Sequence, residues 1–275
     1  MIVDYHMHLR RGDGDDVEMT EHSLDAVERY IAAARAAGVD EIAITEHVYY
    51  FTETRGLWQM PYHLDHCVFD IDRYVQAIGE AKRRRLPVKL GIEVDYEKGR
   101  EDETRAWLAR HPWDLVLGSL HFVDRLGIDS RPRLIDEVGV EAAWRRYFEG
   151  LGAAAASGLF DALAHPDLVK IWGDRPAAEV ENELFDGLAH DVAEAGICIE
   201  VSTRGLLRPV AEVYPDRRLL VACRERDVPV TLASDAHIAD RVGWRFADAL
   251  ELLAAVGYET LTVFEQREPR QVSFR

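Results

Sequence analysis

The sequence predicts an α/β fold in which seven parallel strands close into a barrel. Short β-branched or apolar runs alternate with helix-like segments along the whole chain, and parallel neighbours require such crossover helices. A length of 275 residues suits an α/β barrel, which often fills such a length as one domain. We therefore expect a single domain over residues 1–275. An open, doubly wound sheet is the alternative.

The expected strands are short runs rich in β-branched and apolar residues. They cover residues 2–5, 42–45, 88–94, 115–120, 161–164, 197–201 and 228–233. A further run over residues 261–264 is expected as an extra edge strand.

The expected helices carry apolar residues at a spacing of three and four. The first follows Ser23, a candidate N-cap, and ends at Gly38, a residue typical of helix ends. The others begin near Asp72, cover 140–157, 179–195 and 216–226, and run from Asp240 to near Gly257. Residues 48–70 form a long, aromatic-rich insertion after the second strand. We interpret it as a candidate lid, with a surface excursion as the alternative.

The charge and composition exclude several classes of protein. The 33 Lys and Arg residues against 50 Asp and Glu give a net charge of −17, which argues against a protein that coats nucleic acid. The N-terminus has no secretory signal pattern, and no apolar run approaches membrane-spanning length, so we expect a cytoplasmic protein without a membrane partner. The three cysteines form no CxxC pair and are expected to be free, buried thiols.

Six of the 11 histidines stand at the ends of expected strands, together with two acidic residues. This set is His6, His8, His47, Glu93, His121, His165, Asp235 and His237. All lie on the C-terminal side of their strands, where barrel enzymes place their chemistry. For the other five histidines we favour structural or exposed positions. A substrate role for His63 and His66 is the alternative to exposure.

His6 and His8 form a His-x-His pair on an extended segment. Both imidazoles lie on the same face, because side chains repeat every second residue along a strand. Such a pair can chelate a borderline metal ion, and Glu93 and Asp235 complete a mixed nitrogen and oxygen set suited to zinc, iron or manganese. The remaining histidines exceed what one ion needs. We therefore expect two or three divalent ions, with Glu93 as the bridging carboxylate.

The motifs that carry these residues occur in a recognisable order. They are Asp4-Tyr5-His6-Met7-His8, Thr45-Glu46-His47, Gly91-Ile92-Glu93, Gly118-Ser119-Leu120-His121, Ala164-His165-Pro166 and Ser234-Asp235-Ala236-His237. Over nearly the whole chain this order resembles the PHP (polymerase and histidinol phosphatase) metallophosphoesterases. Residues 167–170, 199–206, 208–209 and 212–215 are similar to the histidinol-phosphate phosphatase branch. The resemblance implies a distorted seven-stranded β/α barrel, like a TIM barrel, with a trinuclear metal centre at the C-terminal ends of the strands.

The resemblance also implies how the ligands are shared among the ions. It assigns His6, His8, Glu93 and Asp235 to the first ion, His47 and His237 to the second, and His121 and His165 to the third, which shares Glu93. The family usually supplies a further His or Asp soon after the His-x-His pair. We assign Asp13 to that place, with His22 as a remote alternative and a solvated acidic turn as the other interpretation of Asp13.

The activity implied by the resemblance is hydrolysis of a small phosphorylated substrate, L-histidinol phosphate, to L-histidinol and phosphate. The expected nucleophile is a metal-bound hydroxide held by Glu93, Asp235 and His237. For binding the phosphate we expect three cationic residues that follow the fifth and sixth strands, each with a surface charge as the alternative. These are Lys170, Arg204 and Arg208. In the segment 48–70, Glu53, Trp58 and Tyr62 are candidates for covering an imidazole and an amine.

Three other functions stay open at this point. The first is hydrolysis of a nucleotide or another small phosphoester. The second is metal-dependent amidohydrolysis, which also uses His-x-His on a barrel but fewer histidines. The third is a non-catalytic barrel that binds a metal or a partner. The intact ligand set argues against the third.

Overall fold

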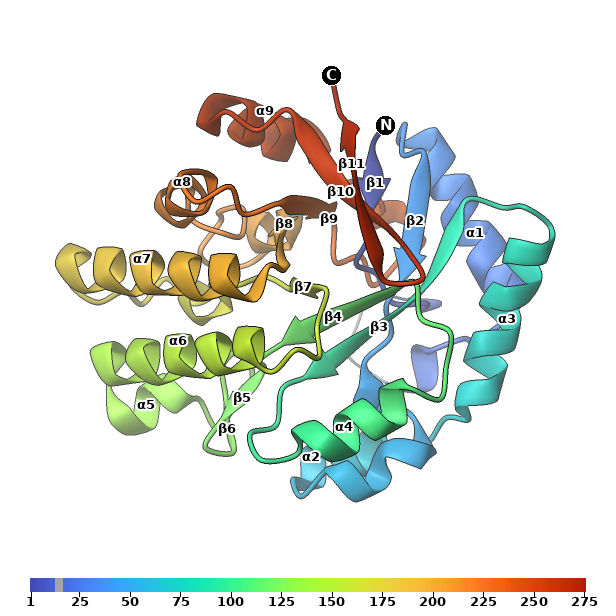
Figure 1. Cartoon of the computed structure of the whole chain (residues 1–275). Helices are drawn as coiled ribbons and strands as arrows, with labels where there is room; N and C mark the ends of the chain where they lie inside the picture. The colour runs from blue at the N-terminus through green and yellow to red at the C-terminus, as the bar shows by residue number, and fades with distance from the viewer. Residues whose placement is uncertain (13–16) are drawn as a thin grey trace.

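Seven parallel strands form one sheet in the computed structural model, which describes residues 1–12 and 17–275 (Figure 1). Their order is β1-β2-β3-β4-β7-β8-β9, so each strand lies beside the next one of the sheet in the sequence. They are β1 (Val3–Asp4), β2 (Glu41–Ile44), β3 (Val88–Asp95), β4 (Leu115–Ser119), β7 (Ala162–Leu163), β8 (Cys198–Ser202) and β9 (Val230–Ala233).

The sheet closes where β1 meets β9. The amide of Tyr5 donates to the carbonyl oxygen of Leu232 at 3.0 Å, and the amide of His8 donates to that of Ala236 at 2.8 Å. Between them, the Asp4 carboxylate accepts hydrogen bonds from the backbone and the hydroxyl of Ser234. These bonds confirm the predicted barrel and rule out the open sheet.

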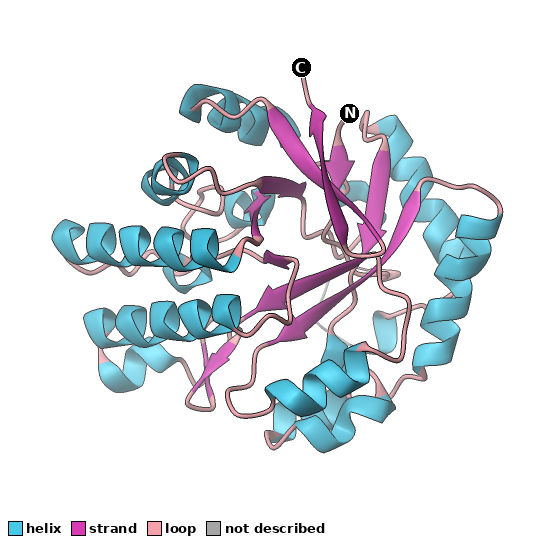
Figure 2. Ribbon diagram, in the orientation of Figure 1, coloured by secondary structure: helices cyan, strands magenta, loops and turns pink. Residues whose placement is uncertain are grey.

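Helices surround the strands, as Figure 2 shows in cyan around magenta. The larger ones are α1 (Leu24–Ala36), α3 (Ile71–Arg83), α4 (Glu101–Leu108), α6 (Val140–Ala156), α7 (Ala178–Ala195), α8 (Arg217–Arg224) and α9 (Phe246–Val256). The hydroxyl of Ser23 accepts a hydrogen bond from the amide of Ala26, which confirms the predicted N-cap of α1. The last helix begins at Phe246 rather than at Asp240, and α4 was not expected.

Short elements fill the connections on the C-terminal side of the barrel. They are α2 (Pro61–His66), α5 (Leu134–Val138), the strand pair β5 (Phe122–Val123) and β6 (Leu126–Gly127), and the 3-10 turns Val17–Met19, Val48–Tyr50, Thr52–Leu57, Leu168–Lys170, Thr203–Leu207 and Ala239–Arg241. Among these segments are the next elements after six strands of the barrel, namely those that begin at Val17, Val48, Phe122, Leu168, Thr203 and Ala239. They therefore lie at the edge where the strand-end histidines are found.

An antiparallel hairpin ends the chain, formed by β10 (Thr260–Glu265) and β11 (Glu268–Ser273). The expected extra strand over 261–264 is therefore part of a separate two-stranded sheet and not an edge of the main one. Arg267, in the turn of this hairpin, binds the Asp161 carboxylate, and its amide donates to the carbonyl oxygen of Asp114. Since these acids directly precede β7 and β4, the hairpin covers the N-terminal end of the barrel, opposite the histidines.

The three cysteines, Cys67, Cys198 and Cys223, are buried and free, as predicted. Among the residues that the structure describes, every helix is too short or too polar to span a bilayer.

Candidate metal centre

Glu93 lies at the centre of the strand-end histidines. Its side chain projects from β3 and is buried, with a residue exposure of 1%. One carboxylate oxygen, Oε2, lies 2.7 Å from His47 Nδ1, 3.4 Å from His6 Nε2 and 3.7 Å from His8 Nε2. The other oxygen, Oε1, lies 3.2 Å from His165 Nε2 and 3.6 Å from His121 Nε2. A single carboxylate thus reaches imidazoles that follow four other strands, as the sequence predicted for a bridging group.

Asp235 forms the second acidic group of the cluster. Its Oδ1 lies 3.6 Å from His8 Nε2, 3.9 Å from His6 Nε2 and 3.5 Å from His237 Nδ1. The backbone of Asp235 has a φ of 50° and that of His165 a φ of 28°, a region that non-glycine residues seldom occupy. Such strained positions cluster at functional sites, where the surrounding structure holds them.

Two further carboxylates form hydrogen bonds with the outer nitrogens of the imidazoles, and a third lies near one. His6 Nδ1 lies 2.8 Å from Glu200 Oε2, His121 Nδ1 lies 3.0 Å from Asp95 Oδ1, and His8 Nδ1 lies 3.5 Å from Glu46 Oε2. Carboxylates in such positions fix the orientation of a metal-binding imidazole and raise its basicity. Sequence reasoning gave these acids no role, although Glu200 had a signal, since it is a charged residue inside an expected buried strand.

Burial and the charges of the cluster strongly shift the pKa values of its side chains. Burial alone would raise the pKa of Glu93, but the imidazoles of His47 and His6 outweigh burial and hold the pKa well below its usual range. Burial opposes the charged form of His121, yet Asp95 and Glu93 raise its pKa to about 10. Burial lowers the pKa of His47 to about 4. The carboxylates thus require positive charge beside them, which either protons on selected imidazoles or metal cations can supply.

The donor atoms at the centre fit divalent metal ions. In the described part of the chain, several buried atoms contact only the other charged or imidazole groups of the cluster, at 2.7–3.9 Å, and none has a well-aligned hydrogen bond, which is rare for buried polar groups. These atoms are His6 Nε2, His8 Nε2, His47 Nδ1 and Glu93 Oε2. Two ligands about 2.0–2.2 Å from one ion lie within roughly 4.4 Å of each other. Four groups of three residues have donor atoms within 4.8 Å: His6, His8 and Glu93; His8, His47 and His237; His47, Glu93 and His121; and His6, His165 and Asp235.

The structure thus brings together all eight strand-end residues that the sequence singled out. The groupings overlap more than the expected division among three ions, because His6, His8 and His47 each belong to two groups. The expected His121 and His165 pair is adjacent, with ring centroids 5.1 Å apart and both Nε2 atoms on Glu93 Oε1. Asp13 lies outside the described residues. His22 lies 3.5 Å from Glu46 Oε1, behind His8.

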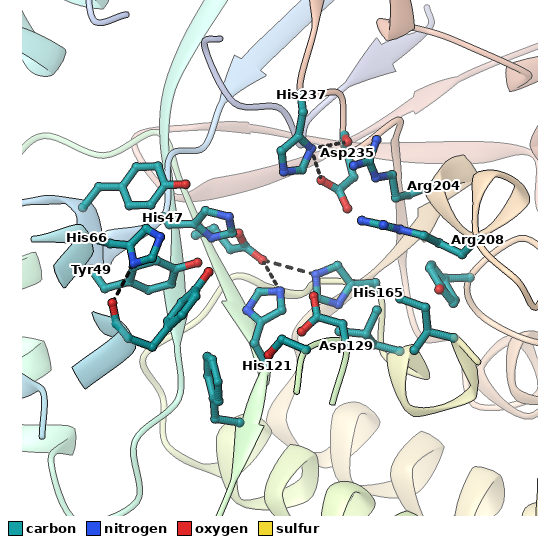
Figure 3. Close-up of a pocket in the computed structure, with 18 of the residues that line it drawn as sticks. His47, Tyr49, His66, His121, Asp129, His165, Arg204, Arg208, Asp235 and His237 are labelled. Carbon is teal, nitrogen blue, oxygen red and sulfur yellow. Dashed lines mark hydrogen bonds and ion pairs between the residues drawn. The ribbon is translucent and has the colours of Figure 1, made fainter. Parts of the chain in front are cut away.

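A cavity opens beside the cluster, and Figure 3 shows the residues that line it. Arg204 and Arg208, two of the three predicted phosphate-binding residues, lie together on one side near Asp235 (Figure 3). Two other charged residues line the cavity and were missed. Arg10 follows His6 and His8 at the same spacing of two residues, so the sequence could have placed its side chain on the same face. Asp129 follows the β5–β6 hairpin, where the sequence gives no signal.

Lys170 does not reach this cavity. Its side chain has 0% exposure, and its ammonium group lies 2.9 Å from Asp167 Oδ2, 3.1 Å from Glu212 Oε2 and 3.0 Å from the carbonyl oxygen of Val213. The prediction that Lys170 binds substrate is therefore corrected to a role in a buried ion pair. Position after a strand places a residue at the right edge but does not set the direction of its side chain.

Residues 48–70 form one wall of the cavity. Tyr49, Tyr50, Tyr62 and His66 line it, and a role for the segment as a moving lid stays a prediction. Trp58 is buried, with its indole N–H donating to Thr54, so it does not cover the cavity as expected. Glu53 is exposed and is not among the lining residues.

The two histidines of this segment are not the exposed residues that the sequence analysis favoured. His63 is buried at 2% exposure and lies against Trp58, with ring centroids 4.8 Å apart. His66 is half-buried and lines the cavity. The alternative of a substrate role, which the sequence analysis left open for both, therefore remains for His66.

A β/α barrel with overlapping histidine and carboxylate groups at the C-terminal ends of its strands defines a barrel protein built to hold several metal ions. A model of the PHP domain matches residues 17–204 of this chain, which is more than half of its length. A probable histidinol-phosphatase of Deinococcus radiodurans is 33% identical over 270 residues, covering 95% of this chain and 96% of that protein. The chain belongs to the PHP family.

Solved structures agree with this assignment at the level of the fold. A histidinol phosphate phosphatase of Lactococcus lactis, solved with zinc, L-histidinol and phosphate, superposes with a TM-score of 0.77 over 98% of both chains at 20% identity. A putative histidinol phosphatase of Listeria monocytogenes gives a TM-score of 0.74 at 24% identity, covering 90% of this chain and 99% of that one.

Proposed function

We propose that this protein is a metal-dependent phosphomonoesterase that hydrolyses L-histidinol phosphate to L-histidinol and phosphate. The observation that carries the proposal is the position of Glu93, whose two carboxylate oxygens lie within 4 Å of imidazoles following four other strands. The histidinol-phosphatase relative from Deinococcus, which matches over nearly its whole length, supports this choice of substrate.

The proposed ligands are the eight clustered residues together with Asp13. They are His6, His8, Asp13, His47, Glu93, His121, His165, Asp235 and His237. Divalent ions such as zinc, iron or manganese supply, when bound, a lowered pKa for water and positive charge for the phosphoryl oxygens. Glu93, Asp235 and His237 are the proposed residues at the place where water attacks.

The reaction itself exchanges one bond to phosphorus for another. A water oxygen bonds to phosphorus, the bond between phosphorus and the ester oxygen breaks, and the leaving alkoxide takes up a proton. We propose that Arg204 and Arg208 bind the phosphoryl oxygens, because a guanidinium group matches their geometry by bidentate contact. Glu200, Asp95 and Glu46 keep the imidazoles in position, so that little reorganisation accompanies the reaction.

The direct experiment is phosphate release from L-histidinol phosphate by protein reconstituted with zinc, iron or manganese. We expect turnover with metal and none after chelation, and a much higher kcat/KM than with a nucleoside monophosphate or a simple alkyl phosphate. A nucleotide hydrolysed faster than histidinol phosphate would contradict the proposed substrate. Metal binding without hydrolysis of any phosphoester would contradict the proposed reaction. We also propose that this enzyme acts in the cytoplasm.

A further inference from the structure

The cavity beside the metal cluster carries chemically different groups on its opposite sides. In Figure 3, Arg204 and Arg208 lie on one side, and Tyr49 and His66 lie on the other, with His47, His121 and His165 between them. Asp129 lies in this view beside His121 and His165. A ligand that spans the cavity therefore meets guanidinium groups at one end, aromatic rings at the other and a carboxylate in between.

The hydrogen bond of His66 determines what this side chain offers to a ligand. His66 Nδ1 lies 2.6 Å from the carbonyl oxygen of Tyr62, which can only accept, so Nδ1 carries the hydrogen. In a neutral imidazole the other nitrogen, Nε2, is then an acceptor. No hydrogen-bond partner of Nε2 is found within the described chain, and His66 lines the cavity. The site thus presents an acceptor for an N–H donor.

Aromatic rings beside this acceptor suit a planar ligand. The rings of Tyr62 and His66 have centroids 4.3 Å apart, and Tyr49 lies 5.7 Å from Tyr62 and packs in a stacked arrangement on His47. Offset or edge contacts between rings at such distances stabilise a bound aromatic group. The aromatic wall and the acceptor at His66 therefore match the chemistry of a flat ring with an N–H on its edge.

Asp129 offers a binding position for a cation. Among the described residues, no side chain forms an ion pair or hydrogen bond with its carboxylate, although it lines the cavity and is half-buried. Burial raises its pKa, and the nearby charges of His121 and Arg208 oppose this effect. A carboxylate in such surroundings binds an ammonium group favourably, because a direct charge-assisted bond replaces lost solvation.

We propose that substrate binds in one direction across the cavity, with its phosphate at Arg204 and Arg208, its ammonium group at Asp129 and its imidazole N–H at His66 Nε2. This inference rests on the proposed function and deepens it. Histidinol phosphate carries its ammonium group on the carbon chain between the ester and the ring, which is the order of these binding groups. His66 and Asp129 are thus specificity-determining residues, and neither is among the proposed metal ligands.

The test compares three substrates on metal-loaded protein. They are L-histidinol phosphate, L-phenylalaninol phosphate, whose ring has no N–H, and 3-(imidazol-4-yl)propyl phosphate, which has no amine. We expect His66→Phe to reduce the preference for histidinol phosphate over the phenyl analogue about 10-fold, since one hydrogen bond is lost. We expect Asp129→Asn to reduce the preference over the des-amino analogue by about 10- to 100-fold. Each variant should leave the other preference unchanged.

Three controls make the outcome decisive. His190→Phe and Asp191→Asn change exposed residues of α7 and should alter neither preference. His66→Gln, whose amide oxygen can accept a hydrogen bond, should restore part of the ring preference and replaces His66→Phe if that variant fails to fold. The metal content of each variant, measured by plasma mass spectrometry, should match that of the unmodified protein.

The possible failures are distinguishable. If the unmodified enzyme hydrolyses histidinol phosphate but both preferences survive in His66→Phe and Asp129→Asn, the proposed direction of binding is wrong while the function stands. If both preferences fall together with the metal content, these residues act through the metal centre and the inference is also overturned. If the unmodified, metal-loaded protein releases no phosphate from histidinol phosphate, the proposed function itself fails.

Discussion

The metal centre depends on the carboxylates that bind the outer nitrogens of the imidazoles as much as on the ligands themselves. Glu200 shows this best, because it receives His6 Nδ1 on one oxygen and the backbone amide of His165 on the other. One side chain of β8 thus positions residues that follow β1 and β7. This strand supplies none of the eight clustered residues.

We predict that Glu200→Gln weakens metal binding by about 10- to 100-fold, as is typical when the carboxylate behind a metal-binding imidazole is lost. Competition with a chromophoric chelator measures the affinity. Glu194→Gln, an exposed change on α7, is the matched control and should leave the affinity unaltered. An unchanged affinity in Glu200→Gln would mean that His6 needs no support from Glu200.

Arg204 and Lys170 allow a second test, because Arg204 lines the cavity whereas Lys170 is buried in an ion pair with Asp167. We expect Arg204→Ala to raise KM for a phosphomonoester about 10- to 100-fold through loss of a charge-assisted contact, with Arg110→Ala as an exposed control. Lys170→Met should leave KM close to its original value. Since it leaves Asp167 buried without its cation, it should lower the free energy of unfolding by about 3–5 kcal/mol. Urea titration and steady-state kinetics give both quantities, and the reverse pattern would contradict the placement of these residues.

The sequence predicted those site residues that stand at the ends of strands. It did not predict residues whose role depends on the direction of the side chain. Strand ends meet at one edge of a barrel, so His6, Glu93 and Asp235 could be found without coordinates. Asp129 could not be found in this way, because it follows a short hairpin whose sequence shows no regular spacing of apolar residues. Lys170 was placed wrongly because its side chain turns towards Asp167 and away from the cavity.

The position of Glu93 depends on how closely β2 and β3 approach each other. A Cβ atom at Gly91 of β3 would lie 2.5 Å from Thr45 Cγ2 and 2.9 Å from the carbonyl oxygen of Ile44. Real Cβ atoms do not approach so closely, so any larger residue at this position forces the two strands apart. Gly91 is two residues before Glu93, and a displaced β3 would move the bridging carboxylate.

We predict that Gly91→Ala destabilises the protein by about 1–3 kcal/mol, the usual cost of inserting a methyl group into a packed site, and lowers its metal affinity. Gly187→Ala is the control, since a Cβ atom there meets nothing within 4 Å. It lies within α7, so alanine should stabilise the helix by about 0.5–1 kcal/mol. Chemical denaturation of both variants measures whether the free energy of unfolding falls in Gly91→Ala and rises in Gly187→Ala. Equal changes in the two variants would contradict the close contact between β2 and β3 at Gly91.

Helices and strands with a regular spacing of apolar residues were predicted. Elements that form only through contacts with distant parts of the chain were not. The amphipathic pattern of α6 and the apolar run of β3 predict these two elements from the sequence alone. The strand over 260–265 was found but wrongly placed at the edge of the main sheet, because only the turn after it shows that it pairs with β11. Within residues 48–70, α2 is stabilised by aromatic packing between Tyr62 and Tyr49, which no local signal reveals.

The metal centre joins the first and the last strand of the barrel. Ligand candidates come after β1 and after β9, and Asp4 already links these strands through Ser234. Ions held between His6, Glu93 and Asp235 would connect three distant parts of the barrel. Since an unfolded chain lacks such a site, metal binding adds directly to the stability of the folded state.

Removal of metal should therefore destabilise the entire barrel. At free metal 100 times above Kd the gain is about 2.7 kcal/mol, so chelation should lower Tm by roughly 5–10 °C. Differential scanning calorimetry with and without chelator measures this shift. The variant Glu93→Gln is the control and should respond much less, because the shared ligand is missing. An equal Tm with and without chelator in the unmodified protein would contradict a structural contribution of the metals.

In this structure, histidines and carboxylates from distant parts of the sequence come together to hold several metal ions at one end of the barrel. Anomalous X-ray scattering from crystals of metal-loaded protein, recorded on both sides of the absorption edge of the metal, tests this arrangement most directly. We predict two or three anomalous peaks, each about 2.0–2.2 Å from donor atoms of this cluster, with Glu93 between two of them. Peaks only elsewhere on the protein, or none in metal-loaded crystals, would contradict the account.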